Sequence, residues 1–564
     1  NGEPYLAACE IHMHNYYDRY DIAPANAVSF TTSYSNKYLT GNGIEIPAPY
    51  LLAHGKLVAS KTRILDNGYT HNWGSKKWVT SVSFYDEDGN VIQTHTKNPW
   101  SDELEGEWDI TTIQYNFSGQ PVLSILDHPG TGNGNRPSGA IVQVKKTYDQ
   151  FNGRLQTTEH RIGDVPATPW YNLNRYVYDE LGKVAQKDLG FVERQEYKYN
   201  LRGQLKSIND LYVHTLAPAA ANKVTYASIL GYDTDFDDKR YDGKLSGYQW
   251  RTAGSADPMA YGYTYDDAGR MTHAEYRYNN GSSWIKTARD YTTSNLAYDA
   301  NGNMQSMTQR GESSFLNAVT TIDDLSYQYD ASGTRLLNVE DNGNNSSVRI
   351  NDFNDGLIGQ TGDDYEYNKN GHLTKDQNRG ITNITYNHSG QPLEITKGTD
   401  GSIKHIYTAD GALLQKVVTD NTQSPATTTT YHYWGPFVYK NDDLEMVMHE
   451  EGRARYTNPG FAYDYFVKDH LGNVRNIVKG TMSYGSLEYV ASFERISATI
   501  EEDVFDQIGN VRDLKPLGTP GDLESGILDG GLEDKRIGAA IMVHAMSGET
   551  FNLKGYGYYD NTNT

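Results

Sequence analysis

Cysteine is almost absent from this sequence, since Cys9 is the only one among 564 residues. A single cysteine excludes an internal disulfide framework, so folding does not depend on an oxidising compartment. Long apolar runs are also missing, and none approaches the ~20 residues that span a bilayer. The sequence begins at Asn1 without Met and carries no signal-peptide pattern. We therefore expect an excerpt of a longer polypeptide, with any targeting signal outside it.

Basic residues are scarce relative to acidic ones. The chain has 50 Lys and Arg against 72 Asp and Glu, which gives a net charge of −22. Binding to phosphate backbones needs clustered Lys and Arg, so this balance argues against a nucleic-acid partner. An acidic, solvated surface that keeps a large protein in solution is the simpler interpretation.

Phenylalanine is also rare, whereas tyrosine is abundant. The sequence contains 14 Phe and 45 Tyr, together with 54 Gly and 18 Pro. Tyrosine favours strands, and its ring can pack while its hydroxyl stays polar. Because turn residues are frequent and helical apolar periods are few, the composition predicts an all-β fold with many turns.

One short pattern, Tyr-Asp/Asn-x-x-Gly, recurs along most of the chain. In Tyr263–Met271 it reads as a strand, a tight turn closed by glycine and a return strand. The well-formed copies are Tyr85-Asp86-x-x-Gly89, Tyr115–Gly119, Tyr178-Asp179-x-x-Gly182, Tyr199–Gly203, Tyr265-Asp266-x-x-Gly269, Tyr298-Asp299-x-x-Gly302, Tyr329-Asp330-x-x-Gly333, Tyr367–Gly371 and Tyr386–Gly390. Looser copies lie at Tyr148–Gly153 and Tyr407–Gly411, and Tyr241–Leu245 looks like a diverged one. Such self-similarity indicates a repeat architecture.

Each copy has the chemistry of a β-hairpin turn. The Asp or Asn can bond its own downstream backbone, and the Gly accepts positive φ without steric cost. A lone hairpin is only marginally stable, so each one must pair with the next. The repeat therefore predicts a continuous array, in which these residues are structural.

Three regions follow from where the repeat begins and ends. Residues 1–75 lack it and could form a cap, a plug or irregular strands at the start of the array. Residues 76–485 carry the hairpins, with exposed loops predicted at 129–139 and 420–430. Residues 486–564 lack the repeat and differ in composition, with acidic stretches and Gly-rich turns. Two runs at 536–545 and 551–556 predict paired strands of a small separate β domain.

The most specific motif lies near the end of the array. Tyr465 is followed by the run Asp469-His470-Leu471-Gly472-Asn473-Val474-Arg475. With the Tyr-Asp/Asn-x-x-Gly repeats, this run resembles the RHS-repeat, or YD-repeat, proteins at the start of their associated core region. The resemblance covers roughly residues 75 to 480.

This resemblance implies a fold and a function. The fold would be a long sheet of hairpins that spirals into a hollow shell. The function would be that of the non-catalytic shell of a secreted bacterial polymorphic toxin, which encloses and delivers its own C-terminal toxin or effector segment with the help of secretion machinery. A cell-surface adhesin that binds glycans or proteins is the alternative, since related surface proteins also carry YD repeats.

The family's Asp-Pro-rich self-cleavage motif is not found in this sequence. The one Asp-Pro pair, Asp257-Pro258, lies inside the array without the family's flanking pattern. We therefore expect that any self-cleavage site lies beyond Thr564.

Candidate catalytic and metal sites each have a simpler structural interpretation. No Gly-x-Ser-x-Gly elbow occurs, and Gly130–Asn135 lacks the third glycine and the helix of a phosphate loop. His12 and His14 share one strand face, a spacing that can bind metal, but Cys9 and Glu10 do not complete a known site. The run 233–238 begins like a calcium loop, yet has Asp238 and Lys244 where that loop needs Gly and Glu. We expect no enzyme activity, metal or cofactor.

Two further interpretations concern aromatic and acid–base residues. Asp469 and His470 suggest proton transfer, but we expect Asp469 to cap its turn and His470 to pack or face solvent. The rows of tyrosines could stack on sugars, or on one another as the core of the array, and we favour the second.

Overall fold

The computed structural model describes the larger part of the chain. The described residues are 11–41, 43–65, 78–100, 108–130, 139–163, 168–214, 224–233, 236, 238–255, 257–313, 318–343, 353, 362–457, 460–480, 508–514 and 524–526. The chain divides into two compact units, residues 1–482 and 483–564. The predicted boundary near 485 lies outside the described residues and stays a prediction.

The first unit is almost entirely antiparallel β-sheet. One sheet contains 31 strands, and β22 and β23 form a separate pair. The strands of the first half are β1 (Met13–Asp18), β2 (Ala53–Leu65), β3 (Trp78–Tyr85), β4 (Val91–Lys97), β5 (Trp108–Tyr115), β6 (Pro121–His128), β7 (Ala140–Tyr148), β8 (Leu155–Ile162), β9 (Tyr171–Tyr178), β10 (Val184–Leu189), β11 (Glu193–Tyr199), β12 (Leu205–Ile208), β13 (Tyr226–Gly231), β14 (Gly247–Thr252), β15 (Met259–Tyr265), β16 (Met271–Asn279) and β17 (Trp284–Ile285). Those of the second half are β18 (Thr293–Tyr298), β19 (Met304–Ser313), β20 (Ala318–Tyr329), β21 (Leu336–Asp341), β22 (Tyr365–Tyr367), β23 (Leu373–Asp376), β24 (Asn383–Tyr386), β25 (Pro392–Lys397), β26 (Gly401–Thr408), β27 (Leu413–Asp420), β28 (Thr427–Trp434), β29 (Phe437–Lys440), β30 (Asp443–His449), β31 (Gly452–Thr457), β32 (Gly460–Lys468) and β33 (Val474–Lys479).

The helical elements of the first unit are short. Those in the described residues are η2 (Ala25–Ala27), η3 (Ser35–Lys37) and α1 (Asp210–His214). The all-β prediction is confirmed. No helix in the described ranges is long and apolar enough to cross a membrane.

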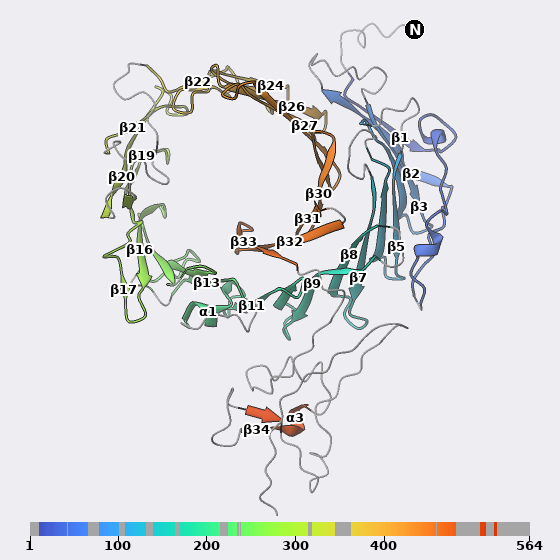
Figure 1. Cartoon of the computed structure of the whole chain (residues 1–564), viewed down its shortest axis with the longest axis horizontal. Helices are drawn as coiled ribbons and strands as arrows, with labels where there is room; N and C mark the ends of the chain where they lie inside the picture. Colours follow the sequence, from blue (N-terminus) through green and yellow to red (C-terminus); the bar gives the residue numbers. More distant parts are fainter. Residues whose placement is uncertain are drawn as a thin grey trace, which may run out of the picture. The chain divides into compact units, whose positions relative to one another are not determined.

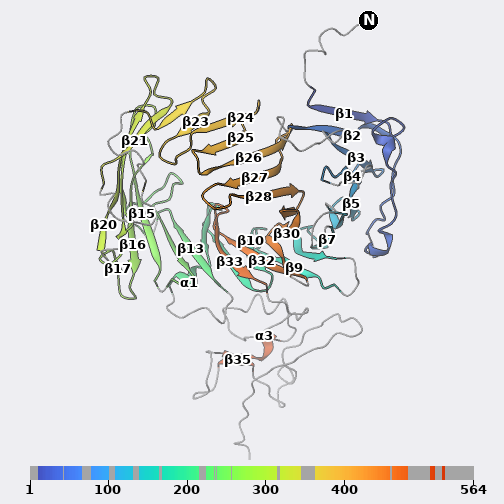
Figure 2. The same ribbon diagram turned by 45° about the horizontal axis from the view of Figure 1, so that its top comes forward.

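Apart from the separate β22–β23 pair, successive strands pair in chain order, so the sheet grows as a ribbon of hairpins. Figure 2 shows β24 to β28 following one another along this ribbon. Because the strands alternate in direction, the Tyr-Asp/Asn-x-x-Gly turns all lie along one edge of the ribbon, which we call the turn edge. The connections between hairpins lie along the opposite edge, the loop edge.

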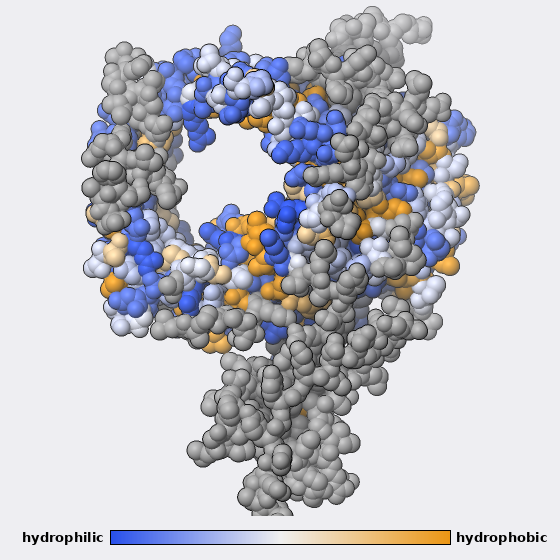
Figure 3. All heavy atoms as spheres, viewed as in Figure 1, coloured by the Kyte–Doolittle hydropathy of each residue, from blue (hydrophilic) through white to orange (hydrophobic). Residues whose placement is uncertain are grey.

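The ribbon closes on itself. Ile64 and Leu65 at the end of β2 pair with Thr408 and Tyr407 of β26, and the amide of Ala409 donates to the carbonyl oxygen of Arg63 at 2.8 Å. The first lap of the ribbon therefore runs from β2 to β26 and surrounds a central opening (Figure 1). Side chains leave the centre of this unit open in the space-filling view (Figure 3).

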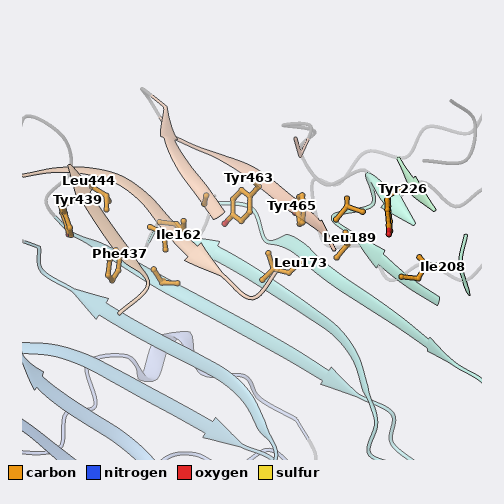
Figure 4. Close-up of a cluster of buried hydrophobic side chains, with 14 residues drawn as sticks. Ile162, Leu173, Leu189, Ile208, Tyr226, Phe437, Tyr439, Leu444, Tyr463 and Tyr465 are labelled. Atoms are coloured by element: carbon orange, nitrogen blue, oxygen red, sulfur yellow. The ribbon is translucent and has the colours of Figure 1, made fainter. Parts of the chain in front are cut away.

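A second lap lies on the inner face of the first. Strands β31 and β32 are drawn inside the ring beside β8 and β9 in Figure 1. Val142, Leu173 and Leu189 of the first lap pack against Phe437 and Tyr463 of the second in one buried cluster. Figure 4 shows Leu173 and Leu189 of the first lap and Phe437 and Tyr463 of the second in this cluster, between the two layers. The wall is thus a double layer in this sector, with its core between the laps.

The N-terminal segment covers the outer face of the same sector. Tyr34 packs on Leu123 and Ile125 of β6, whereas Leu126 of that strand belongs to the cluster between the laps. Alternate residues of a strand point to opposite faces, so the segment and the second lap lie on opposite sides of the sheet. Buried Gln93 exchanges two hydrogen bonds with the backbone of Thr31, at 2.9 and 3.0 Å, and fixes the segment there.

The predicted loop at 420–430 is shorter than expected. β27 ends at Asp420 and β28 begins at Thr427, so Thr427–Thr430 belongs to a strand. Four threonines in succession are β-branched and fit a strand that pairs with β27. Most of the other predicted loop, 129–139, lies outside the described residues.

The second unit is described only at a few elements. They are α3 (Ile508–Val511), β34 (Arg512–Leu514) and β35 (Glu524–Gly526), and the two strands pair antiparallel. The strands predicted at 536–545 and 551–556 lie outside the described residues.

Candidate functional site

The repeat turns share one geometry, which Asp266–Arg270 illustrates. The amide of Gly269 donates to the carbonyl oxygen of Asp266 at 2.8 Å, and that of Arg270 donates to Asp266 Oδ1 at 2.8 Å. Gly269 has φ 77°, and the strand register shifts between Thr264 and Tyr265. This is a type I turn followed by a glycine bulge, which glycine forms without a Cβ penalty.

The tyrosine of each repeat binds the hairpin before it. Tyr265 Oη donates to the carbonyl oxygen of Leu245 at 2.8 Å, and Tyr298 Oη to that of Met271 at 2.8 Å. In nearly every case the acceptor is the second residue after the preceding turn glycine. The same bond joins Tyr85 to Leu57, Tyr115 to Val91, Tyr148 to Pro121, Tyr178 to Leu155, Tyr199 to Val184, Tyr232 to Leu205, Tyr329 to Met304, Tyr367 to Leu336 and Tyr386 to Leu373.

This series corrects the prediction at Tyr241. The tyrosine that makes the repeat bond in this hairpin is Tyr232, whereas Tyr241 is 65 % exposed. An insertion between Tyr232 and Gly243 moves the turn away from its tyrosine, which hid the copy in the sequence. Phe236 of this insertion lies over Gly231 and Gly247, where a Cβ would come within 2.5 Å of its ring.

In several turns the residue after the glycine reaches forward to the next turn. Arg270 Nη1 donates to the carbonyl oxygen of Asp299 at 2.9 Å, and its guanidinium lies 5.0 Å from the ring centre of Tyr298. Lys183 Nζ donates to the Gly203 carbonyl oxygen at 2.5 Å. In Tyr265–Arg270 the tyrosine, the aspartate, the glycine and the residue after the glycine therefore all bind within the turn or to a neighbouring hairpin, which accounts for these positions as structural.

The Asp469–Arg475 turn has the same geometry with more partners. Asp469 Oδ1 accepts the amides of Leu471 and Asn473 at 2.9 Å each, and Oδ2 accepts Arg475 Nε at 2.8 Å and Asn473 Nδ2 at 3.1 Å. Burial alone would raise the pKa of Asp469, but these donors outweigh it and lower the pKa. Such a carboxylate holds the turn and is a poor proton carrier.

An open depression of about 450 Å³ lies beside this turn, where the second lap meets β14 and β15. Its lining combines aromatic and basic side chains with aliphatic ones: Gly243, Lys244, Leu245, Tyr248, Tyr263, Tyr265, Met271, His470, Leu471 and Arg475. The His470 ring lies 5.4 Å from that of Tyr248, and burial lowers its pKa. His470 therefore stays neutral at pH 7 and packs at the wall.

The depression is suited to binding a flat or aromatic group. Burial raises the pKa of Tyr263 and of Tyr265, so both hydroxyls remain protonated donors. Arg475 is paired with Asp469 at 2.7 Å, which leaves Lys244 as the less neutralised cation of the lining. No serine or cysteine nucleophile is among these lining residues.

A buried polar cluster that the sequence did not reveal joins the two laps. His128 Nδ1 lies 2.9 Å from Asp109 Oδ1, His128 Nε2 lies 2.6 Å from Tyr439 Oη, and Trp434 Nε1 donates to Asp109 Oδ2 at 2.8 Å. A carboxylate only accepts, so Nδ1 donates to Asp109, and Nε2 shares a hydrogen bond with the Tyr439 hydroxyl. All four side chains are buried, so the cluster fixes the second lap to the first.

A second interlap contact uses Glu451. Its Oε1 accepts Asn174 Nδ2 at 2.9 Å, and its Oε2 pairs with Lys187 Nζ at 2.7 Å. Nearby, His160 Nδ1 lies 2.8 Å from Tyr463 Oη. The partners in these contacts between the laps are 264 to 325 residues apart in the sequence, so no local sequence pattern predicts their pairing.

The other sequence candidates have packing or pairing roles. His12 lies against His388 with ring centres 4.5 Å apart, and His14 lies 5.2 Å from Trp78. Asp257 pairs with Arg289. Within the described ranges no group of three or more His, Cys, Asp or Glu could hold a metal ion. Cys9, Glu10 and most of the Gly130–Asn135 run lie outside those ranges.

No family model and no curated protein matches this chain. Several solved structures are similar to it. TcdB2-TccC3-Cdc42 aligns with 12% identity and a TM-score of 0.24, over 76% of this chain and 27% of that chain. The Photorhabdus luminescens Tc holotoxin pore aligns with 12% identity and a TM-score of 0.22, over 78% of this chain and 27% of that chain. TcdB2-TccC3 without its hypervariable C-terminal region aligns with 13% identity and a TM-score of 0.21, over 77% of this chain and 29% of that chain.

This chain spans between a quarter and a third of the length of those chains. At such TM-scores the superpositions carry no argument, so the account of the molecule stands on its own geometry.

Proposed function

We propose that this chain is the non-catalytic wall of a hollow shell that encloses a polypeptide. The observation that carries the proposal is the closure of the sheet through β2 and β26, with a second lap on the inner face. A wall that returns to its own start surrounds a volume, and a second layer stiffens the sector that it covers. This architecture fits the resemblance to the RHS-repeat proteins.

The cargo is proposed to be the C-terminal toxin or effector segment of the natural polypeptide, delivered by a secreted or surface-exposed bacterial protein in competition between cells. Secretion machinery would be the partner in export. The wall itself is proposed to have no enzyme activity, because the residues of its repeat are engaged in turn and interhairpin bonds.

Protection of the cargo from protease tests this function. In the complete natural polypeptide we expect the C-terminal segment to resist protease while the wall is closed. Ile64→Asp should remove that protection, because Ile64 is buried where β2 meets β26 and packs with Ile406 and Leu414. Ile477→Asp is the matched control, since Ile477 is 51 % exposed on β33.

The fold of both variants is checked by circular dichroism. Equal cleavage of the C-terminal segment in the wild type and in Ile64→Asp would contradict the proposal.

Glycan binding at the cell surface is the second candidate, and the tyrosine-lined depression is the feature that favours it. Sugar rings stack on aromatic faces, and Tyr263 and Tyr265 border an open depression. A glycan array with the wild type and Tyr263→Ala tests this function. Binding that Tyr263→Ala abolishes would support it, and an array without binding would rule it out.

A further inference from the structure

A lysine, an asparagine and a glutamate meet where the second lap packs on β9 and β10. Glu450 and Glu451 connect β30 to β31, and the tip of this hairpin contacts the two strands of the first lap. Glu451 Oε2 lies 2.7 Å from Lys187 Nζ, and Glu451 Oε1 accepts Asn174 Nδ2 at 2.9 Å. An amine and a side-chain amide are therefore held by the two oxygens of one carboxylate.

The positions of Lys187 and Asn174 in the sheet allow their side chains to be joined. In the ladder between β9 and β10, Asn174 is paired with Leu189, and Lys187 lies two residues before Leu189. Lys187 and Asn174 are therefore diagonal neighbours on one face of the sheet. Such neighbours are about 7–8 Å apart, and a long side chain spans that distance.

The three groups are shielded from water. Asn174 is fully buried, Glu451 is 4 % exposed and the Lys187 side chain is 17 % exposed. Tyr176 covers them, since its hydroxyl donates to Glu451 Oε1 at 3.4 Å and its ring centre lies 5.7 Å from Lys187 Nζ. A site with little water strengthens each polar contact and protects a reacting carbonyl group from hydrolysis.

The carbonyl oxygen of the Asn174 side chain is the one polar atom of this group that has no partner within the described residues. Nδ2 donates to Glu450 Oε1 and to Glu451 Oε1, whereas Oδ1 is buried without a donor. A buried acceptor without a donor costs free energy. A proton that passes from Lys187 to Glu451 removes this cost when the amide rotates by half a turn, because a carboxylic acid donates to Oδ1. The same transfer leaves Lys187 as a neutral amine.

We propose that Lys187 and Asn174 become joined by an intramolecular isopeptide bond, with Glu451 as the proton carrier. The neutral Nζ attacks Asn174 Cγ, and the π electron pair of the carbonyl group moves onto Oδ1, which Glu451 stabilises. When the carbonyl group forms again, the bond between Cγ and Nδ2 breaks and its electron pair stays on Nδ2. The two protons that Nζ has lost go to Nδ2, which leaves as an ammonium ion. Glu451 ends the reaction as a carboxylate.

The bond depends on the second lap. Lys187 and Asn174 both belong to the first lap, but their proton carrier lies on the hairpin between β30 and β31. The reaction therefore takes place only after the second lap has packed on β9 and β10. The product is a covalent link between these two strands in the double-layered sector of the wall.

The intact mass of the full chain, measured under denaturing conditions, tests the bond. The wild type should be lighter than its sequence by the mass of one ammonia molecule. Lys187→Arg keeps a cation beside Glu451 but has no amine that can react, and Glu451→Gln removes the proton carrier, so both should have their full sequence mass. Lys145→Arg is the matched control. Lys145 forms an ion pair with Glu159 at 2.5 Å, and its replacement should leave the mass deficit unchanged.

Trypsin digestion and tandem mass spectrometry locate the bond, because cyclisation of another asparagine loses the same mass. Peptides 162–175 and 184–194 should remain joined, without cleavage after Lys187. Circular dichroism checks that the variants are folded. A wild type of full mass, a mass deficit without these joined peptides, or a deficit that persists in Lys187→Arg or Glu451→Gln would each overturn the proposal.

Discussion

The tyrosine hydroxyl gives the repeat a reason to use tyrosine in place of phenylalanine. Both rings would cover the neighbouring hairpin, but only tyrosine can donate to a backbone carbonyl oxygen of the strand before it, as Tyr298 does to Met271. The carbonyl lies beside the turn, where the bulge interrupts the ladder of the strands. The hydroxyl therefore ties each hairpin to the one before it at the point where pairing is weakest.

Removing one such hydroxyl should cost a modest amount of stability. Tyr298→Phe keeps the ring and loses the 2.8 Å bond to Met271, so we expect unfolding free energy to fall by about 0.5–1.5 kcal/mol in urea denaturation. Tyr241→Phe is the control, because Tyr241 is 65 % exposed. Equal stability of the Tyr298→Phe variant and the wild type would show that the bond is replaced by water at no cost.

Glycine at the turn should be harder to replace. Gly269 has φ 77°, which a β-branched residue rarely adopts, so Gly269→Val should lower the unfolding free energy by about 1–3 kcal/mol. Gly460 begins β32, has no left-handed φ and has open space around its Cβ position, which makes Gly460→Ala the matched control. A neutral Gly269→Val in thermal unfolding would refute the role of this glycine.

The turns were readable in the sequence because their chemistry is local. Asp266 and Arg270 are four residues apart, so the pattern itself contains the bond. The partner of a repeat tyrosine lies 13 to 31 residues away and depends on which hairpin precedes it. The acceptor of this hydrogen bond can be identified only when the order of the hairpins in the sheet is known. The sequence pattern therefore did not predict a partner for the tyrosine hydroxyl.

At the scale of elements, the contact between the laps is the feature with the most buried polar chemistry. His160 and His449 lie between the layers with ring centres 5.7 Å apart, next to Tyr463. Burial and, to a smaller extent, the nearby His449 lower the pKa of His160 to about 3. Burial also lowers the pKa of His449 to about 4, against the opposing effect of Glu450 and Asp464.

Acid should therefore separate the laps. An unfolded histidine titrates near pH 6.5, whereas these two stay neutral in the folded wall. The contribution of the two neutral histidines to the unfolding free energy is complete above about pH 6.5. It is lost as the pH falls toward 4, at up to about 1.4 kcal/mol per pH unit for each histidine. We expect the loss of stability on acidification, followed by urea denaturation at several pH values, to be smaller in His160→Gln.

His388→Gln serves as the control for this experiment, since His388 is exposed. The same pH dependence in His160→Gln and in the wild type would contradict the assignment.

The contact between the laps could not be predicted from the sequence. Nothing in the sequence of residues 437–468 identified β6 to β11 as the surface against which β29 to β32 pack. His128 and Tyr439 are 311 residues apart, and their pairing follows from the length of one complete lap. The number of hairpins in a lap depends on sheet twist and curvature, which accumulate from many small contributions.

At the scale of the whole wall, the curvature and the closure decide the function. Ile64 of β2 and Thr408 of β26, which pair where the ring closes, are 344 residues apart in the sequence (408 − 64). The repeat predicted an array of hairpins, and the resemblance to the RHS-repeat proteins supplied the expectation that the array is hollow. The closing pair itself joins Ile64 and Leu65, which precede the first repeat, to Thr408 and Tyr407 at a looser copy.

The central claim is that this wall encloses a polypeptide, and a cryo-electron microscopy map of the complete natural polypeptide tests it most directly. The account predicts a wall that closes through β2 and β26, with the second lap inside and further density in the central opening. An open sheet, or a closed wall with an empty interior and the C-terminal segment outside, would contradict it.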